Sequence, residues 1–108
     1  MRKYKVAWAD GTTKEVEGSK ITVYIGNIGY EFIIHESLIY SCAYELSDKA
    51  SGLHICSLME YMPAANRDKR LAAKLAIADI VKTRGAEKVL SALKNAPKLE
   101  SKSLPKNR

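Results

Sequence analysis

The amino-acid sequence predicts an α+β fold, in which an antiparallel β-meander sheet over residues 3–58 precedes a C-terminal helical segment or helical hairpin packed on one face. Two observations predict this division. The first sixty residues alternate apolar and polar side chains between turn signals, whereas residues 67–95 repeat apolar side chains at helical spacing. The 108 residues are enough for one domain, which we place at residues 1–97, before a disordered basic tail at residues 98–108.

Each expected strand ends at a turn signal. The Asp10-Gly11 pair favours a hairpin, because both central positions of such a turn need positive φ. Gly18 and Ser19 are expected to end the second strand. Short turns between neighbouring strands favour antiparallel pairing. Five or six strands are predicted, at residues 4–8, 12–17, 21–25, 30–35, 38–46 and 53–58.

The helical half begins after a connector that contains Pro63. Asn66 is the predicted N-cap of a first helix, in which four of the seven residues 72–78 are alanine, the best helix former. Gly85 interrupts the pattern before a second helical stretch at residues 86–95. That glycine stands where a helix-turn-helix motif would turn. The second stretch has no Arg, Asn or Gln near its start to contact bases, which favours a helical hairpin packed on the sheet.

Charge is distributed unevenly along the chain. Residues 1–62 carry six Lys/Arg and eight Asp/Glu, a net charge of −2, whereas residues 63–108 carry twelve and four, a net charge of +8. This asymmetry predicts a small non-catalytic binding protein, whose basic C-terminal half contacts nucleic acid or an acidic protein surface. Arg67, Arg70 and Lys74 have the spacing of one helical face. The candidate contact residues are Arg67, Lys69, Arg70, Lys74, Lys82 and Arg84.

Three alternatives remain open at this point. The basic face could serve only to keep the protein in solution. The chain could be an accessory or inhibitor protein, of the kind common in phages and mobile elements, that binds another protein through its sheet. It could also be a small enzyme, but it has no nucleophile elbow, oxyanion turn or phosphate-binding glycine loop. We therefore predict that it is not an enzyme, and the oligomeric state stays open.

The soft metal ligands are few, and they give no metal-site spacing. His35, Cys42, His54 and Cys56 contain only one close pair, whereas a zinc site usually has a close pair at each end. We predict neither a metal nor another cofactor. With no secretion signal and no apolar stretch of about 18 residues, the chain is expected to be cytoplasmic and to make no membrane contact.

The two cysteines are predicted to be unbridged. We expect Leu46 to lie opposite Leu53, because large apolar residues then meet across the strand pair. In that register the sulfurs of Cys42 and Cys56 point to opposite faces of the sheet.

Overall fold

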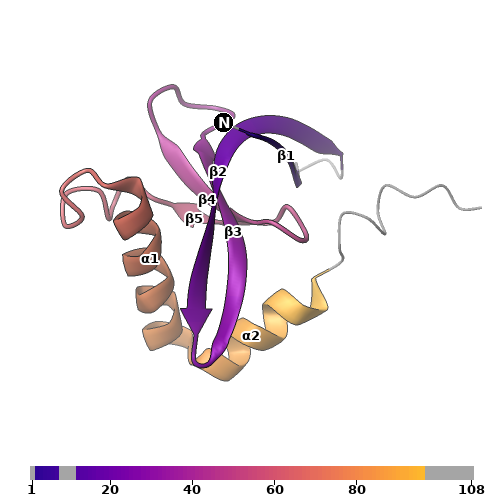
Figure 1. Ribbon diagram of the computed structural model, residues 1–108, viewed down its shortest axis with the longest axis vertical. Coiled ribbons are helices and arrows are strands. Elements are labelled where there is room, and N and C mark those ends of the chain that lie inside the picture. The colour runs from indigo at the N-terminus through magenta and orange to yellow at the C-terminus, as the bar shows by residue number, and fades with distance from the viewer. Residues whose placement is uncertain (1, 8–11, 97–108) are drawn as a thin grey trace, which may run out of the picture.

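The computed structural model describes residues 2–7 and 12–96, and it confirms the predicted α+β fold with an antiparallel sheet (Figure 1). The strand order β1-β2-β3-β4-β5 follows the sequence, as expected for a meander. The Asp10-Gly11 turn and the predicted tail at residues 98–108 lie outside the described residues. The elements are β1 (Arg2–Ala7), β2 (Thr13–Ile25), β3 (Ile28–Glu36), β4 (Tyr44–Asp48), β5 (His54–Ser57), α1 (Lys69–Arg84) and α2 (Ala86–Asn95).

The long strand β2 replaces two predicted strands, so the expected break at Gly18 was wrong. The first part of β2 pairs with β1, the second part pairs with β3, and Gly18 belongs to both ladders. A Cβ atom at Gly18 would lie 2.5 Å from the carbonyl oxygen of Ile34. Only glycine allows the two backbones to approach so closely. The strand therefore bends here and continues, as its curvature in Figure 1 shows.

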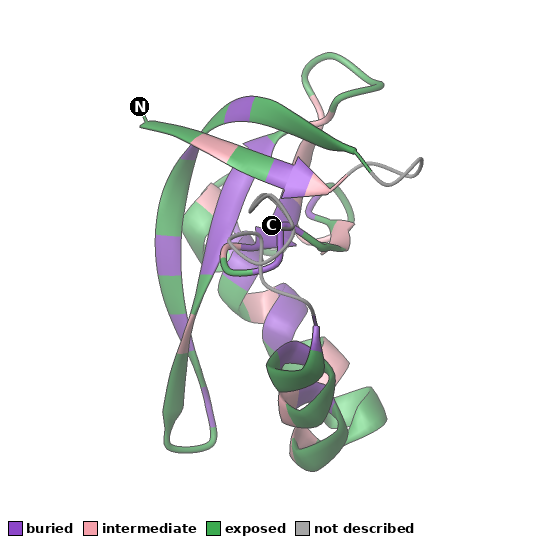
Figure 2. Ribbon diagram, turned by 90° about the vertical axis from the view of Figure 1, so that its right-hand side faces the viewer, coloured by how far each residue is buried: buried purple, intermediate pink, exposed green. Residues whose placement is uncertain are grey.

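The main core lies between the helices and one face of the sheet. Three alternate residues in the second part of β2, Ile21, Val23 and Ile25, point into it. Buried and exposed residues alternate along this strand in Figure 2. The helix α1 contacts β2 and β3, and three alanines on its inner side let it lie close to them. The most buried members of this core are Ile21, Ile25, Phe32, Leu46, Leu58, Ala72, Ala73 and Ala76.

A second, smaller apolar cluster lies on the opposite face of the sheet. The strand β1 folds over this face, and the amide of Ala7 donates a hydrogen bond to the carbonyl oxygen of Gly52 in the β4–β5 turn, at 2.8 Å. Val6 of β1 is buried, as are Val16 of β2 and Ile33 of β3, and none of the three belongs to the main core. The contact between β1 and the β4–β5 turn brings two distant parts of the sheet together and partly closes it.

The segment predicted as strand 38–46 is strand only from Tyr44 onward. The preceding residues form an ordered loop, in which the Ser37 hydroxyl accepts hydrogen bonds from two following amides, each at 3.1 Å. Cys42 adopts a left-handed φ of 63°, and its amide donates to the Glu36 carboxylate at 2.9 Å. These local hydrogen bonds compete with strand pairing and delay the start of β4.

The predicted pairing of β4 with β5 was also wrong. Leu46 lies opposite Cys56 rather than Leu53, and Ser47 lies opposite His54. Ile55 has no partner residue on β4, so β5 contains a β-bulge at this position. Both cysteines are free, as predicted, but Cys42 is unbridged because it lies in the exposed loop, not because of the expected register.

The helices differ from expectation at their ends. Asp68, not Asn66, caps α1, and its carboxylate accepts hydrogen bonds from two amides of the first turn, at 3.0 and 3.3 Å. Asn66 and Arg67 take left-handed φ values of 53° and 64°, which end the connector before the helix begins. Gly85 alone joins the helices, with φ 90° and ψ 140°. One residue is too short for a hairpin loop, so α2 turns away from α1 across the lower part of Figure 1.

Candidate functional site

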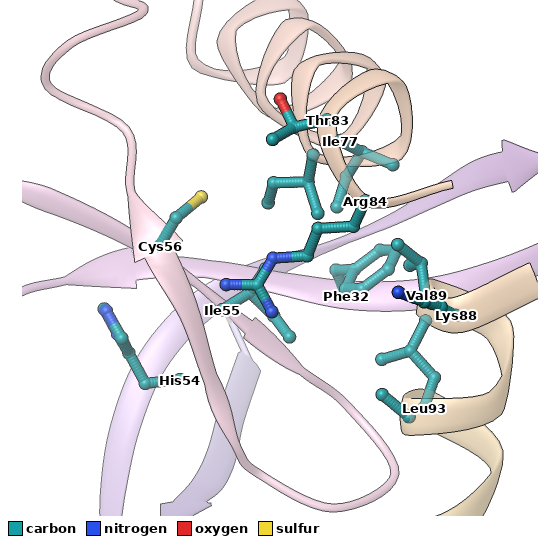
Figure 3. A pocket seen from close by; sticks show the side chains of 12 residues that line it. Phe32, His54, Ile55, Cys56, Ile77, Thr83, Arg84, Lys88, Val89 and Leu93 are labelled. Carbon is teal, nitrogen blue, oxygen red and sulfur yellow. The ribbon is translucent and has the colours of Figure 1, made fainter. Parts of the chain in front are cut away.

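An open groove of about 650 Å³ lies where the two helices approach β5 (Figure 3). It exists because α1 packs on β2 and β3, while the sheet extends further, to β5. The C-terminal part of α1 forms one wall, α2 a second and β5 a third. The lining residues are Phe32, His54, Ile55, Cys56, Ile77, Ile80, Thr83, Arg84, Lys88, Val89, Ala92 and Leu93.

The groove reaches around the outer edge of β5. Cys56 pairs with Leu46, whose side chain belongs to the helix-covered core. His54 pairs with Ser47, on the opposite face of the sheet. Since paired residues share a face, a groove that touches both His54 and Cys56 must pass the edge of the strand. The bulge adds Ile55, which also packs against the main core.

Two cationic side chains border the apolar floor of this groove. In Figure 3 the Arg84 side chain extends from the end of α1 toward β5, and Lys88 lies on the α2 side, near Phe32 and Val89. Both residues are exposed, and neither forms an ion pair with any residue in the described part of the chain. A positive charge beside apolar surface favours a ligand that is both anionic and apolar.

Acidic groups near β5 make the two ends of the groove differ in charge. Glu45 lies 3.6 Å from the His54 ring, measured from Oε1 to Nδ1. Burial, and then the nearby Glu60 charge, raise the pKa of the Cys56 thiol to about 11. The positive end of the groove is therefore the end formed by Arg84 and Lys88, and the Cys56 thiol is protonated at neutral pH.

The predicted contact residues do not form one stripe. Arg67 precedes α1 and has a left-handed backbone, so its expected place on the helical face was wrong. The Lys69 ammonium lies 4.2 Å from the centre of the Tyr44 ring. The guanidinium of Arg70 donates to the carbonyl oxygen of Lys20 on β2, at 3.2 Å. These two cations hold α1 against the sheet.

The other three predicted residues are exposed on α1, and one of them lies in the groove. Lys74 and Lys82 line no part of it. Arg84 lines the groove. At a rise of 1.5 Å per residue, it lies about 21 Å further along the helix than Arg70. Whether these residues contact an anionic partner stays a prediction. Sequence reasoning omitted Lys88 from the candidate set, because only the turn at Gly85 brings it opposite Arg84.

A buried serine–histidine pair joins β3 to β4. His35 Nδ1 donates to the carbonyl oxygen of Glu36 at 2.9 Å, which leaves Nε2 to accept from the Ser47 hydroxyl at 2.8 Å. Both side chains are almost wholly buried, so this hydroxyl is not exposed at the surface. The pair satisfies two polar groups inside the sheet. The absence of enzymatic activity stays a prediction.

Exposed apolar side chains mark a second surface feature. Ile39 and Tyr40, in the loop between β3 and β4, are 70% and 68% exposed, and Leu38 beside them is 39% exposed. At the tip of the β2–β3 hairpin, Tyr24 and Ile28 are also exposed. Large apolar side chains gathered on an ordered loop are typical of protein contact surfaces.

Over residues 2–7 and 12–96, no group of three or more metal-ligating side chains is close enough to hold an ion. No helix within these ranges is long and apolar enough to cross a membrane. No family model, curated protein or solved structure matches the chain.

Proposed function

We propose that this chain is a small non-catalytic binding protein that holds an acidic segment of a partner protein in the groove between β5 and the helices. The observation that carries the proposal is a pair of exposed cations, Arg84 and Lys88, beside an apolar floor. A carboxylate bound between them would gain charge-assisted hydrogen bonds. Neighbouring apolar side chains of the same segment would cover Ile55, Ile80 and Ala92, the apolar lining residues that keep exposed surface.

An acidic protein segment suits this site better than nucleic acid does. Single-stranded nucleic acid is usually held by exposed rings on which bases stack. No Tyr or Trp lines the groove, and the Phe32 ring has no exposed surface. The His54 ring is exposed, but the Glu45 carboxylate lies 3.6 Å from it and would repel a phosphate. Double-stranded nucleic acid needs a row of cations facing phosphates, whereas Lys69 and Arg70 are engaged by Tyr44 and β2. The net charge of +6 would still steer an acidic partner toward the protein.

Selection from a library of random twelve-residue peptides tests the proposal. We expect the selected peptides to combine Asp or Glu with apolar residues. By fluorescence anisotropy, the variant R84Q/K88Q should bind them about tenfold or more weakly, because it removes two charge-assisted contacts. The matched control K74Q/K82Q removes the same charge from exposed positions of α1 outside the groove. It should change the affinity by less than about threefold.

Three results would reject the proposal. The first is that no peptide is enriched. The second is that the control K74Q/K82Q loses as much affinity as R84Q/K88Q, which would mean that the effect comes from net charge alone. The third is gel retardation of generic DNA or RNA that weakens with added salt and is lost in R84Q/K88Q but not in K74Q/K82Q, which would favour the nucleic-acid alternative.

A second candidate function rests on the exposed loop between β3 and β4. An accessory or inhibitor protein that acts through its sheet would use Ile39 and Tyr40 as its contact surface. Under the groove proposal, the variant I39S/Y40S should bind the selected peptides normally. Loss of binding in this variant, with R84Q/K88Q unaffected, would favour the second function.

A further inference from the structure

We infer that the acidic segment binds in extended conformation, as a sixth strand added to the free edge of β5. This inference rests on the proposed function and specifies its binding mode. Three features support it: the backbone of β5 that faces away from β4, the course of the groove around this strand, and the contrast between the two edges of the sheet.

The outer side of β5 offers unpaired backbone groups. The amide of Leu58 donates to the carbonyl oxygen of Tyr44 on β4, at 2.9 Å. Backbone groups of successive strand residues point to alternate sides, so the N–H and C=O of the preceding residue, Ser57, point away from β4. Ser57 is exposed, and β5 is the last strand of the sheet. Among residues 2–7 and 12–96, no backbone hydrogen bond occupies this side of Ser57.

An added strand in the groove would place acidic and apolar side chains beside Arg84, Lys88 and the apolar floor. A strand hydrogen-bonded to β5 lies about 4.8 Å beyond it, within the groove that passes this edge. Its side chains alternate between the two faces of the sheet. Those on the helix side would meet the apolar floor and the Arg84 and Lys88 side chains, beside the two adjacent β5 residues that the bulge turns inward, Ile55 and Cys56.

The two sheet edges differ in how they resist pairing. In β1, three of the six residues are Arg or Lys, and exposed charge on an edge strand discourages the addition of another strand. The sequence of β5, His-Ile-Cys-Ser, contains no Lys, Arg, Asp or Glu. The β5 edge, beside the groove, therefore lacks the charged side chains that would discourage the addition of another strand.

Charge also selects the occupant. A second copy of this chain carries a net charge of +6 and would repel the first. Residues 97–108 of the same chain contain four Lys/Arg and one acidic residue, so their sequence does not complement Arg84 and Lys88. An acidic strand of another protein meets the requirements of both the backbone edge and the cations.

Two variants of Ser57 test the backbone pairing with the selected peptide. S57P removes the outward N–H, and proline is tolerated on the free side of an edge strand. S57A keeps this N–H and removes only the hydroxyl, which accepts a hydrogen bond from the Met59 amide at 3.2 Å. We expect S57P to weaken peptide binding about fivefold or more, the effect of one lost hydrogen bond, and S57A to stay within about twofold.

A peptide scan on the unchanged protein gives an independent test, which stands even if S57P fails to fold. N-methylation of successive peptide amides should weaken binding at alternate positions only, because only alternate amides of an added strand face β5. Equal sensitivity at every position, or none, would overturn the inference.

Other outcomes separate this inference from the proposed function. If R84Q/K88Q abolishes binding while S57P and N-methylation have no effect, the groove binds the segment by side chains alone and the added strand is wrong. If no peptide binds at all, the proposed function itself fails. A dimer seen by sedimentation that S57P dissociates would assign the edge to a second copy. Deletion of residues 97–108 that strengthens peptide binding about tenfold would assign it to this chain's own C-terminal segment.

Discussion

Cys56 shows how position determines the chemistry of one side chain. Burial between β5 and the helices, and then the Glu60 charge, raise the pKa of its thiol to about 11. The thiolate is the reactive form, so Cys56 is a weak nucleophile at neutral pH. Cys42, by contrast, lies exposed in the loop between β3 and β4. Two cysteines that look alike in the sequence therefore differ in access, and we expect them to differ in reactivity.

Alkylation of single-cysteine variants measures this difference. At pH 8, C56S, which retains Cys42, should react with a thiol reagent about tenfold or more faster than C42S, which retains Cys56. Because the raised pKa of Cys56 belongs to the folded state, unfolding in urea should make the two rates similar. Equal rates in the folded protein would mean that Cys56 is not shielded by the helices.

Among the strands, β2 owes its length to one residue. Gly18 connects the part that pairs with β1 to the part that pairs with β3. Its missing Cβ leaves room for the backbone of Ile34 and the side chain of Ile33. In a linear sequence this glycine resembles a strand terminator, because its packing partners lie on β3.

The variant G18A should therefore destabilise the protein well beyond an ordinary surface substitution. The added methyl would lie 2.5 Å from the Ile34 carbonyl oxygen and 2.9 Å from the Ile33 side chain, so the strands must separate. We expect a loss of about 2 kcal/mol or more in the free energy of unfolding, measured in urea. The neighbouring S19A, at an exposed position, should stay within about 0.5 kcal/mol. Similar losses in both variants would show that the close approach at Gly18 does not exist.

The whole molecule consists of one sheet with apolar clusters on both faces. The helices cover the larger cluster, and β1 covers the smaller by folding over the sheet to reach the β4–β5 turn. Alternation along β3 directs Phe32 toward the helices and Ile33 toward β1, and neither side chain has any exposed surface. Both faces of this central strand thus contribute to stability.

The smaller cluster can be tested by shortening Ile33. The variant I33A should lower the free energy of unfolding by about 2–5 kcal/mol, the usual cost of removing a buried aliphatic side chain. The same substitution at Ile39, which is 70% exposed in the loop between β3 and β4, should cost less than about 0.5 kcal/mol. If I33A were as mild as I39A, β1 would not cover this face.

Local sequence patterns predicted which helices and strands are present better than they predicted where each one begins, ends or pairs. The fold class and both helical stretches follow from side-chain periodicity. Asn66 was predicted as the N-cap, but Asp68 is also of a type that favours caps, and only the left-handed backbone of Asn66 and Arg67 before α1 selects Asp68. The β4–β5 register depends on the bulge at Ile55, and no periodic pattern marks the site of an extra residue.

The candidate site was less predictable than the fold. Arg84 was among the predicted contact residues, and so were Lys69 and Arg70, which lie away from the groove and contact Tyr44 and β2. The sequence shows that cations are concentrated in the second half of the chain. It does not show which of them meet an apolar surface.

By itself, the sequence determined the α+β class, the order of strands before helices and the charge asymmetry, because each depends on residues close together in the chain. Only the tertiary structure decided that β2 continues through Gly18, that β1 folds over the outer face and that a groove opens beside β5. These features depend on contacts between residues far apart in the sequence. Their partners become known only when the backbones have been packed together.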